Sequence, residues 1–474
     1  MEVVGRLLEK QILSDIYNKQ GSQFVAMYGR RRIGKTFLIR QTYKQNIVFE
    51  CSGLIEGGKN AMLENFWNNL KKINDTGKRI KRPRTWIAAF YELEKSIESL
   101  PKSKGKKVIF LDELPWFDTP RSNFMPAFSN FWNSFCSRRT DILLVICGSA
   151  ASWIINKVVN GRGGLHNRLN HTIRLEPFTF AETKMFLRAK KIQMEVKDIC
   201  QLYMCIGGIP FYLDLLINGR SLAQTFDDLF FRPNAVLARE FDNLYAALFK
   251  NHEKHLAVVL ALNTKSKGLT RSEIISLSYK NSGGGLSLVL QELEECGFIQ
   301  KYVDYDKPRE DGLFRLVDEF TIFYLKHIFE KRGQIKSQEL VNSNIFRIWS
   351  GFAFENFCFR HIRKIAEGLG IAGINYNVYS FVDKGSQNST GAQIDMVIDR
   401  ADNCVNLIEI KYNAGNYNFT KKDLSNMLNK VNSFRLKTKT KKTIFVTLIS
   451  PQGAMINQYS TSIITNEITL DNFV

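Results

Sequence analysis

Short runs of continuous apolar residues alternate with amphipathic segments over the first part of the chain. Three of these runs, residues 24–28, 108–111 and 142–146, are typical of buried strands. A strand that is apolar at every position is covered on both faces, as in a parallel sheet with helices on either side. The pattern therefore predicts an α/β P-loop core with a parallel sheet for residues 1–180, once the motif described below is included.

The pattern changes further along the chain. Residues 181–248 are mostly helical in character, and we interpret them as a helical lid. Residues 249–335 hold three short helices and then a hairpin, which is the element order of a winged helix. Residues 345–474 return to mixed helices and strands. A chain of 474 residues is expected to form about three or four domains, and the pattern predicts four.

Charge narrows the classes of partner. The 66 Lys and Arg residues exceed the 46 Asp and Glu residues, which gives a formal net charge of +20. Such an excess favours nucleic acid first and an anionic membrane second. No basic amphipathic helix supports membrane attachment, and no apolar run reaches the length of a bilayer span. Without a signal-peptide core at residues 1–6 or a CxxC pair, we expect a cytoplasmic protein with reduced cysteines.

Residues 29–36 match the phosphate-binding pattern GxxxxGK[ST], directly after an apolar strand and at the start of a helix. The glycines permit a loop whose N–H groups point at phosphate oxygens, and the helix N-terminus adds its positive dipole end. Lys35 is expected to contact the β- and γ-phosphates of ATP, and Thr36 to bind Mg²⁺. The alternative is a chance Gly-rich turn. The expected nucleotide-binding residues of this segment are Gly29, Arg30, Arg31, Arg32, Ile33, Gly34, Lys35, Thr36 and Phe37.

Two later strands end in polar residues. The run 108–111 is followed by Asp112 and Glu113, and the run 142–146 leads to Ser149. Carboxylates at the carboxyl edge of a parallel strand lie beside the phosphate loop. Asp112 is expected to hold Mg²⁺ and Glu113 to orient or activate the attacking water. Ser149 would lie next to the γ-phosphate.

The ordered motifs resemble the prokaryotic AAA+/STAND-related ATPases often called the archaeal ATPase family, over roughly residues 1–245. The resemblance implies that Ser149 is a sensor and that Arg168, or Arg162, is an arginine finger or nucleotide-state sensor. A surface arginine is the alternative for Arg168. A finger acting in trans would require a homo-oligomer. The matching pieces are Val4-Gly5-Arg6 with Glu9, residues 29–36, Leu111-Asp112-Glu113, Cys147-Gly148-Ser149, residues 168–178 and Gly207-Gly208-Ile209-Pro210.

The third helix of the predicted winged helix is acidic. It carries Glu292, Glu294 and Glu295 and no Lys or Arg, so phosphates would repel it. The basic residues of this module lie on the hairpin instead. The module therefore either contacts DNA through its wing or binds a protein partner, and the second is slightly favoured. The basic hairpin residues are Lys301, Lys307, Arg309 and Arg315.

Acidic residues recur in two neighbouring strands near the C-terminus. Asp395 lies in an alternating strand, and Glu409 and Lys411 share one face of the next. A hairpin register can bring Asp395 alongside them. The two carboxylates would hold one or two Mg²⁺ ions, and the ammonium would orient a water or stabilise the attacked phosphate. The alternatives are an inactive domain whose acids pair with lysines, and a merely solvated role for Asp399 on the same face as Asp395.

This pattern resembles the PD-(D/E)XK restriction-endonuclease-like nucleases, and the fusion resembles the C-terminal domain found on some of these ATPases. The resemblance implies Glu355 as an accessory ligand. We expect ATP binding and hydrolysis coupled to an action on nucleic acid, with DNA favoured. The alternative is a nucleotide-dependent switch or scaffold whose C-terminal domain is inactive. The expected catalytic residues are Glu113, Asp395, Glu409 and Lys411, and the expected metal ligands are Thr36, Asp112, Asp395 and Glu409.

Overall fold

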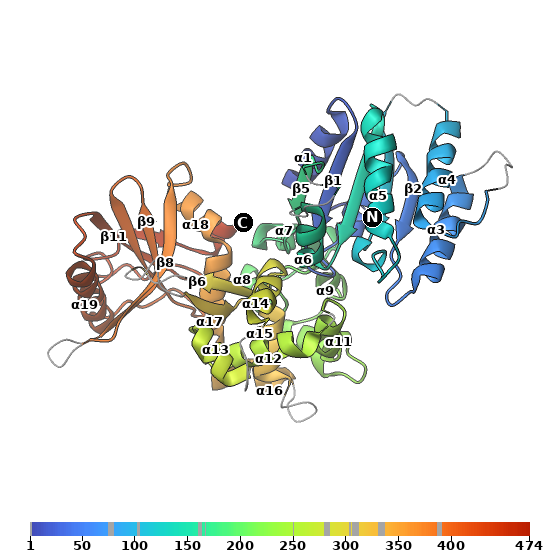
Figure 1. Cartoon of the computed structure of the whole chain (residues 1–474). Helices are drawn as coiled ribbons and strands as arrows, with labels where there is room; N and C mark the ends of the chain where they lie inside the picture. The colour runs from blue at the N-terminus through green and yellow to red at the C-terminus, as the bar shows by residue number, and fades with distance from the viewer. Residues whose placement is uncertain are drawn as a thin grey trace. The chain divides into compact units, whose positions relative to one another are not determined.

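The chain folds into two compact units, residues 1–177 and 178–474, in the computed structural model (Figure 1). The structure describes residues 2–474 except 74–79, 102–104, 160–163, 166, 250, 279–284, 303–304, 306–311, 330–336 and 386–390. Arg162, Lys307 and Arg309 therefore lie outside the described residues. None of the helices in the described part of the chain combines the length and apolarity needed to cross a membrane.

The first unit is built on a parallel five-stranded sheet of order β2-β3-β4-β1-β5. This confirms the predicted α/β fold, and the three predicted strands are β1, β3 and β4. The strands are β1 (Gln23–Tyr28), β2 (Ile47–Ser52), β3 (Lys107–Asp112), β4 (Ile142–Gly148) and β5 (His171–Arg174). The helices are α1 (Leu7–Asn18), α2 (Lys35–Thr42), α3 (Lys59–Ile73), α4 (Trp86–Ser99), α5 (Phe124–Asn130) and α6 (Ala151–Ile154), with short turns η1 (Leu114–Trp116), η2 (Phe131–Phe135), η3 (Cys136–Arg138) and η4 (Ile155–Val159).

Aromatic side chains fill one side of this sheet. Phe90 on α4 is almost fully buried and stacks on Phe131, with 4.8 Å between ring centroids. Phe66 lies edge-on to it at 5.5 Å. Rings packed this closely contribute both buried apolar area and favourable ring geometry. The core beneath α3, α4 and α5 thereby fixes β3 and β4, whose ends carry the acidic and polar residues of interest.

Replacing Phe90 with alanine is expected to lower the free energy of unfolding of the first unit by about 3–5 kcal/mol, because the ring leaves a cavity among other rings. Urea denaturation followed by circular dichroism would measure the change. Ile87→Ala is the matched control, since Ile87 lies on the same helix and is 63% exposed. Equal losses for the two variants would contradict this description of the core.

The second unit begins with helices and continues into three helices and an antiparallel hairpin. The first helices are α7 (Phe180–Ala189), α8 (Val196–Ile206), α9 (Pro210–Asp214), α10 (Leu222–Phe226) and α11 (Glu240–Ala246), with η5 (Asp227–Phe231) and η6 (Val236–Ala238). The next elements are α12 (His252–Asn263), α13 (Arg271–Ser278), α14 (Leu286–Glu295), β6 (Ile299–Tyr302) and β7 (Leu313–Leu316). The winged-helix assignment and the domain boundaries within this unit remain predictions.

A long helix, α17 (Asn344–Arg360), holds several parts of the second unit together. Its last residue, Arg360, forms an ion pair of 2.6 Å with Glu319 at the start of α15 (Glu319–His327). The ring of Phe357 packs edge-on against Tyr203 of α8. Next along the chain, buried His361 accepts a hydrogen bond from the backbone N–H of Phe180, at 3.0 Å. The neighbouring helices are α16 (Ser337–Val341) and α18 (Ile362–Gly368).

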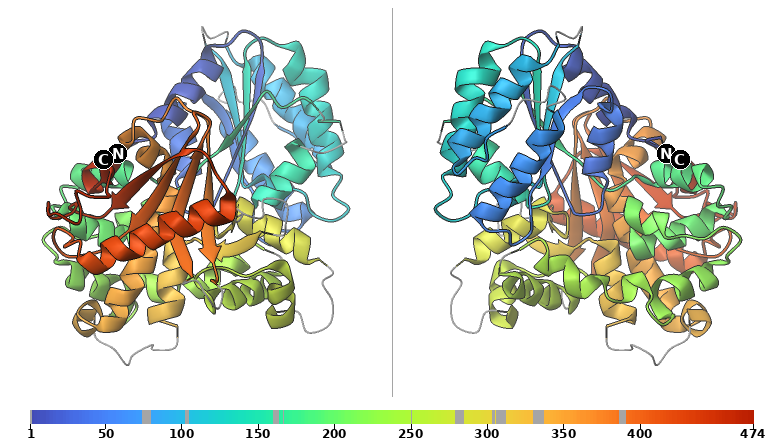
Figure 2. Two further views of the ribbon diagram at one scale, coloured as in Figure 1. Left: turned by 90° about the vertical axis from the view of Figure 1, so that its left-hand side faces the viewer. Right: turned by 90° about the vertical axis from the view of Figure 1, so that its right-hand side faces the viewer.

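A second five-stranded sheet, of order β12-β11-β10-β9-β8, completes this unit. β9 pairs in antiparallel fashion with β8 and with β10, whereas β10, β11 and β12 are parallel. Helix α19 (Lys421–Thr438) lies across one face of the sheet (Figure 2) and packs on it through Met427 and Phe434. The strands are β8 (Tyr376–Asp383), β9 (Ala392–Arg400), β10 (Cys404–Ile410), β11 (Thr443–Ile449) and β12 (Asn466–Ile468), followed by η7 (Leu470–Phe473).

Candidate functional site

The phosphate-loop motif lies between β1 and α2, and both of its glycines are required by the backbone. A Cβ atom on Gly29 would come within 2.3 Å of the Leu175 carbonyl oxygen. Gly34 begins α2 with φ 89°, in the left-handed region that favours glycine. The turn is therefore tight and closely packed on its far side, as a backbone that wraps a phosphate requires.

Lys35 reaches back across this loop. Its side chain is buried, and Nζ donates hydrogen bonds of 2.8 Å to the carbonyl oxygens of Gly29 and Arg30. The arginines of the loop differ in their surroundings: Arg30 is buried, whereas Arg31 and Arg32 are partly exposed.

Thr36 and Asp112 lie in direct contact. The threonine hydroxyl donates a hydrogen bond of 2.8 Å to Asp112 Oδ2. Burial raises the pKa of the Asp112 carboxyl, while the bond from Thr36 and the nearby Lys35 charge oppose the rise. A hydroxyl and a carboxylate in contact are the oxygen donors with which a protein holds one side of a Mg²⁺ ion.

Glu113 is joined to Ser149 at the end of the neighbouring strand. One carboxylate oxygen of Glu113 accepts hydrogen bonds from the Ser149 N–H, at 3.0 Å, and from its hydroxyl, at 2.8 Å. The Glu113 backbone has φ 48°, a left-handed conformation that is unfavourable for a residue with a Cβ. The sequence analysis expected Ser149 near the γ-phosphate but did not predict its contact with Glu113.

Arg168 is exposed in a turn, and among the described contacts only its backbone bond to Leu165 is recorded. The structure brings together Lys35, Thr36, Asp112, Glu113 and Ser149, and in the described part of the chain no hydrogen bond or ion pair joins Arg168 to them. Phe37, on the first turn of α2, is 41% exposed.

Comparison with known sequences decides the class of this site. Residues 4–216 match a family described as an ATPase domain predominantly from Archaea. The chain carries a P-loop ATPase domain. The family match covers less than half of the chain, and it extends from the first unit into the first helices of the second.

One known protein sequence and two solved structures are similar to this chain to different extents. An uncharacterised protein of Methanocaldococcus jannaschii is 24% identical over 417 residues, which cover 86% of this chain and 87% of that protein. A Walker-type ATPase of Pyrococcus abyssi shares the fold with TM-score 0.52 and 16% identity, over 68% of this chain and 96% of its own. The ORC2 protein of Aeropyrum pernix aligns with TM-score 0.43 and 16% identity, over 69% and 95% of the two chains.

The second group of acidic residues lies on β9 and β10 of the C-terminal sheet. The antiparallel register pairs Met396 with Ile408, so Asp395 and Glu409 occupy the next positions on the two strands. Asp395 Oδ2 accepts a hydrogen bond of 2.9 Å from the Ile410 N–H. The expected juxtaposition of Asp395 and Glu409 is thus present in the register.

Two lysines neutralise Glu409. Lys411 Nζ lies 2.8 Å from Glu409 Oε1, and Lys430 Nζ on α19 lies 2.5 Å from Oε2. Lys430 was not predicted, because it follows Glu409 by 21 residues on an element whose packing direction the sequence does not reveal. Asp399 is paired separately with Lys442 at 2.6 Å, which gives it an ion-pair partner of its own.

Two carboxyl groups in this region, those of Asp395 and Glu355, resist ionisation. Burial, followed by the Glu409 charge, raises the pKa of Asp395 to about 6. Burial and the Asp395 charge raise the pKa of Glu355, on α17, to about 7, although Arg315 opposes the rise. Shifts of this kind gather where acidic groups are held close together for a purpose, although ion-pair networks produce them as well.

A cavity of about 280 Å³ opens beside these residues, lined by Glu409, Lys411 and Lys430 among others. Within the described part of the chain, no three His, Cys, Asp or Glu side chains are grouped closely enough to hold a metal ion. Asp395 and Glu409 fit Mg²⁺ only as a pair, with the other ligands supplied by water or by a substrate phosphate, which is a common arrangement for this ion.

Replacing Glu355 with glutamine tests the raised pKa. The folded state binds this proton more tightly than the unfolded chain, because the pKa of Glu355 is raised from 4.5 to about 7. Stability is therefore lost as pH rises through this range, and the loss is complete above it. The variant is expected to gain on the order of 1 kcal/mol of unfolding free energy at pH 8 and little at pH 5. Denaturant midpoints at the two pH values would measure it, with exposed Glu253→Gln as control. A gain that is independent of pH would contradict the assignment.

Two acidic residues of helix α14 have interaction partners within the second unit. Glu292 lies 2.7 Å from buried His255, and Glu294 accepts a hydrogen bond from the Lys301 N–H. On the hairpin, Arg315 donates to Asn356 of α17 at 3.1 Å, and its guanidinium lies over the Tyr302 ring. Some of the charged residues that the sequence analysis related to binding partners therefore form contacts within the second unit.

Proposed function

We propose that this ATPase acts on nucleic acid, with DNA favoured, and that its C-terminal sheet carries a Mg²⁺-dependent phosphodiester-cleaving site. The observation that carries this proposal is the register of β9 and β10, which sets Asp395 beside Glu409 with Lys411 on the same strand face. Two acids and an ammonium are the side chains that metal-assisted attack on a phosphodiester uses.

In the ATPase domain, the loop N–H groups and Lys35 would bind the phosphates of ATP. Thr36 and Asp112, already in contact, would hold Mg²⁺, which neutralises charge on the phosphates when bound. Glu113 would orient the attacking water. Its hydrogen bonds from Ser149 support a sensing role for the serine, because a change at the γ-phosphate could pass from Glu113 to β4 through them.

In the C-terminal site, Asp395 and Glu409 would hold Mg²⁺ against the scissile phosphate. Lys411 would then leave its ion pair with Glu409 to stabilise the attacked phosphate or orient the water. Lys430, which is also paired with Glu409, would supply a second positive charge for the phosphate backbone of the substrate. The net charge of +20 supports a polyanionic substrate, because released counterions favour such binding.

Cleavage assays test the proposal directly. Wild-type protein would be incubated with supercoiled plasmid, linear duplex DNA and RNA, with Mg²⁺ or Mn²⁺, and with or without ATP. We expect metal-dependent cleavage of DNA that responds to ATP, and binding that weakens steeply as salt increases. Absence of cleavage of every substrate under all of these conditions would overturn the nuclease part of the proposal.

A nucleotide-dependent switch or scaffold is the second candidate. The observation that favours it is the double ion pair of Glu409 with Lys411 and Lys430, which satisfies the acid without a metal. In that case ATP would change the conformation of the chain, the winged helix would bind a protein, and Mg²⁺ would not stabilise the second unit. Thermal unfolding with and without Mg²⁺, in the absence of nucleotide, separates the two candidates.

A further inference from the structure

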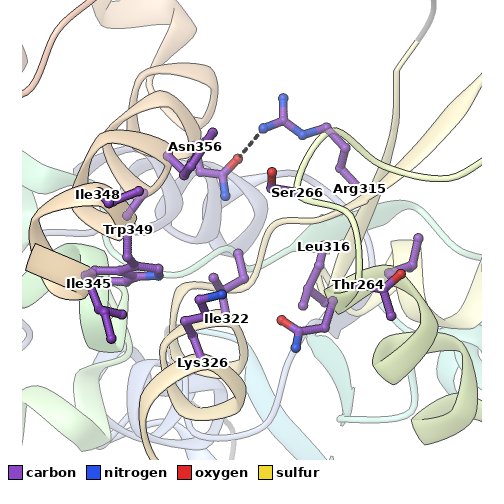
Figure 3. A pocket seen from close by; sticks show the side chains of 14 residues that line it. Thr264, Ser266, Arg315, Leu316, Ile322, Lys326, Ile345, Ile348, Trp349 and Asn356 are labelled. Carbon is purple, nitrogen blue, oxygen red and sulfur yellow. Dashed lines mark hydrogen bonds between the residues drawn. The ribbon is translucent and has the colours of Figure 1, made fainter.

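A pocket of about 360 Å³ lies in the second unit between the end of α12, β7, α15 and α17 (Figure 3). It is separate from the cavity beside Glu409, since the two share no lining residue. Its volume lies at the lower end of the range found for small-molecule sites. None of the functions proposed above uses it.

One face of α17 forms the apolar wall. The helix contributes residues at spacings of three and four, which lie on one side of a helix. Leu262, Leu316 and Ile322 extend this wall from the other elements. The contributing residues of α17 are Ile345, Ile348, Trp349, Phe352, Ala353 and Asn356.

The two charged side chains in the lining of the pocket are both cations. Arg315 and Lys326 bring two positive charges, and none of the described residues that line the pocket is an Asp or Glu. Lys326 is exposed, and no ion pair is recorded for it among the described residues. A lining with two cations and no acid favours an anion.

Two buried N–H donors in this lining lack an acceptor. Trp349 is only 4% exposed, and its indole Nε1 has no hydrogen-bond partner among the described atoms. In Figure 3 the ring nitrogen lies on the side of Ile322 and Lys326. Arg315 Nε is likewise buried and unpartnered, although the same guanidinium donates to Asn356. Buried donors are nearly always satisfied, so these two indicate an acceptor that the described residues do not supply.

We propose that this pocket binds a small organic anion with an apolar body, its carboxylate or phosphate accepting from Arg315, Lys326 and the Trp349 N–H. The body would rest on the α17 face. Ile345, Ile348 and Phe352 are exposed at the rim and alone would suit any apolar partner. The unpartnered donors inside the pocket and its small volume favour a small molecule over a protein segment.

Fluorescence titration of the full chain with 8-anilinonaphthalene-1-sulfonate, an apolar anion, tests this. We expect one saturable site, with Kd raised about tenfold by Lys326→Gln, which removes a positive charge, and by Trp349→Phe, which removes the indole N–H donor. Trp349→Phe retains an aromatic ring, and an unchanged thermal unfolding curve would show that the second unit is folded. Arg347→Gln is the matched control, because Arg347 is an exposed cation on α17 that does not line the pocket.

Competition identifies the anionic group. Displacement of the dye by dodecanoate indicates a carboxylate ligand, and displacement by phenyl phosphate indicates a phosphate ligand. Either result supports the proposal when the two donor variants weaken it and Arg347→Gln does not. Equal binding to all variants, or displacement only by an apolar acidic peptide, overturns it.

Discussion

Lys35→Ala is expected to lower the rate of ATP hydrolysis by about 10²–10³-fold, because it removes a preorganised positive donor from the transferred phosphate. The side chain is buried and already held by two carbonyl oxygens of the loop, so its position requires little reordering when phosphate arrives. Phosphate release under saturating ATP and Mg²⁺ would measure the rate. A fluorescent ATP analogue would separate weakened binding from slowed chemistry.

Lys44→Ala is the matched control for that change. Lys44 lies just after α2 and is exposed, so its loss removes the same charge without touching the loop. We expect its hydrolysis rate to remain within about twofold of wild type, since exposed charges contribute little. Full activity of Lys35→Ala would refute the assignment of the loop.

Asp395→Asn is expected to reduce Mg²⁺-dependent DNA cleavage by about 10²-fold or more, because a neutral amide holds the metal poorly. ATP hydrolysis should be unchanged. The substitution conserves shape and can still accept the hydrogen bond from the Ile410 N–H, so folding should be maintained. Initial rates of plasmid nicking at several Mg²⁺ concentrations would show whether excess metal restores the activity.

Asp399→Asn provides an unusually close control for the site on β9. Asp399 lies on the same strand as Asp395, but it is paired with Lys442. We expect cleavage to remain near wild type and stability to fall by less than about 1 kcal/mol. If both variants lose cleavage equally, the effect belongs to the strand and not to a metal site.

The ATPase site was predictable because most of its parts are local in sequence. The spacing of residues 29–36 between a strand and a helix sets the loop, and the carboxyl ends of parallel strands must share one edge of the sheet. The contact between Glu113 and Ser149 depends on side-chain direction after β3 and β4 end. The sequence places the two residues nearby but does not orient them.

The C-terminal site was predictable only in part. The period-two pattern locates Asp395 and Glu409, and the short connection between their strands fixes the register. Lys430 and Glu355 come from helices on either side of these strands in the sequence, and their approach depends on how each helix is rotated on the sheet. The resemblance to nucleases predicts Glu355 as an accessory ligand, whereas no sequence pattern predicts Lys430.

The left-handed backbone conformation of Glu113 bears on which residues related proteins are expected to carry at this position. A non-glycine residue in such a conformation costs on the order of 1–3 kcal/mol, which glycine at the same place would avoid. Selection for thermal stability alone would favour glycine at this position. Relatives that have lost ATP hydrolysis should therefore carry glycine or asparagine at this position more often than active relatives do. The residue at this position can then help to distinguish active from inactive relatives.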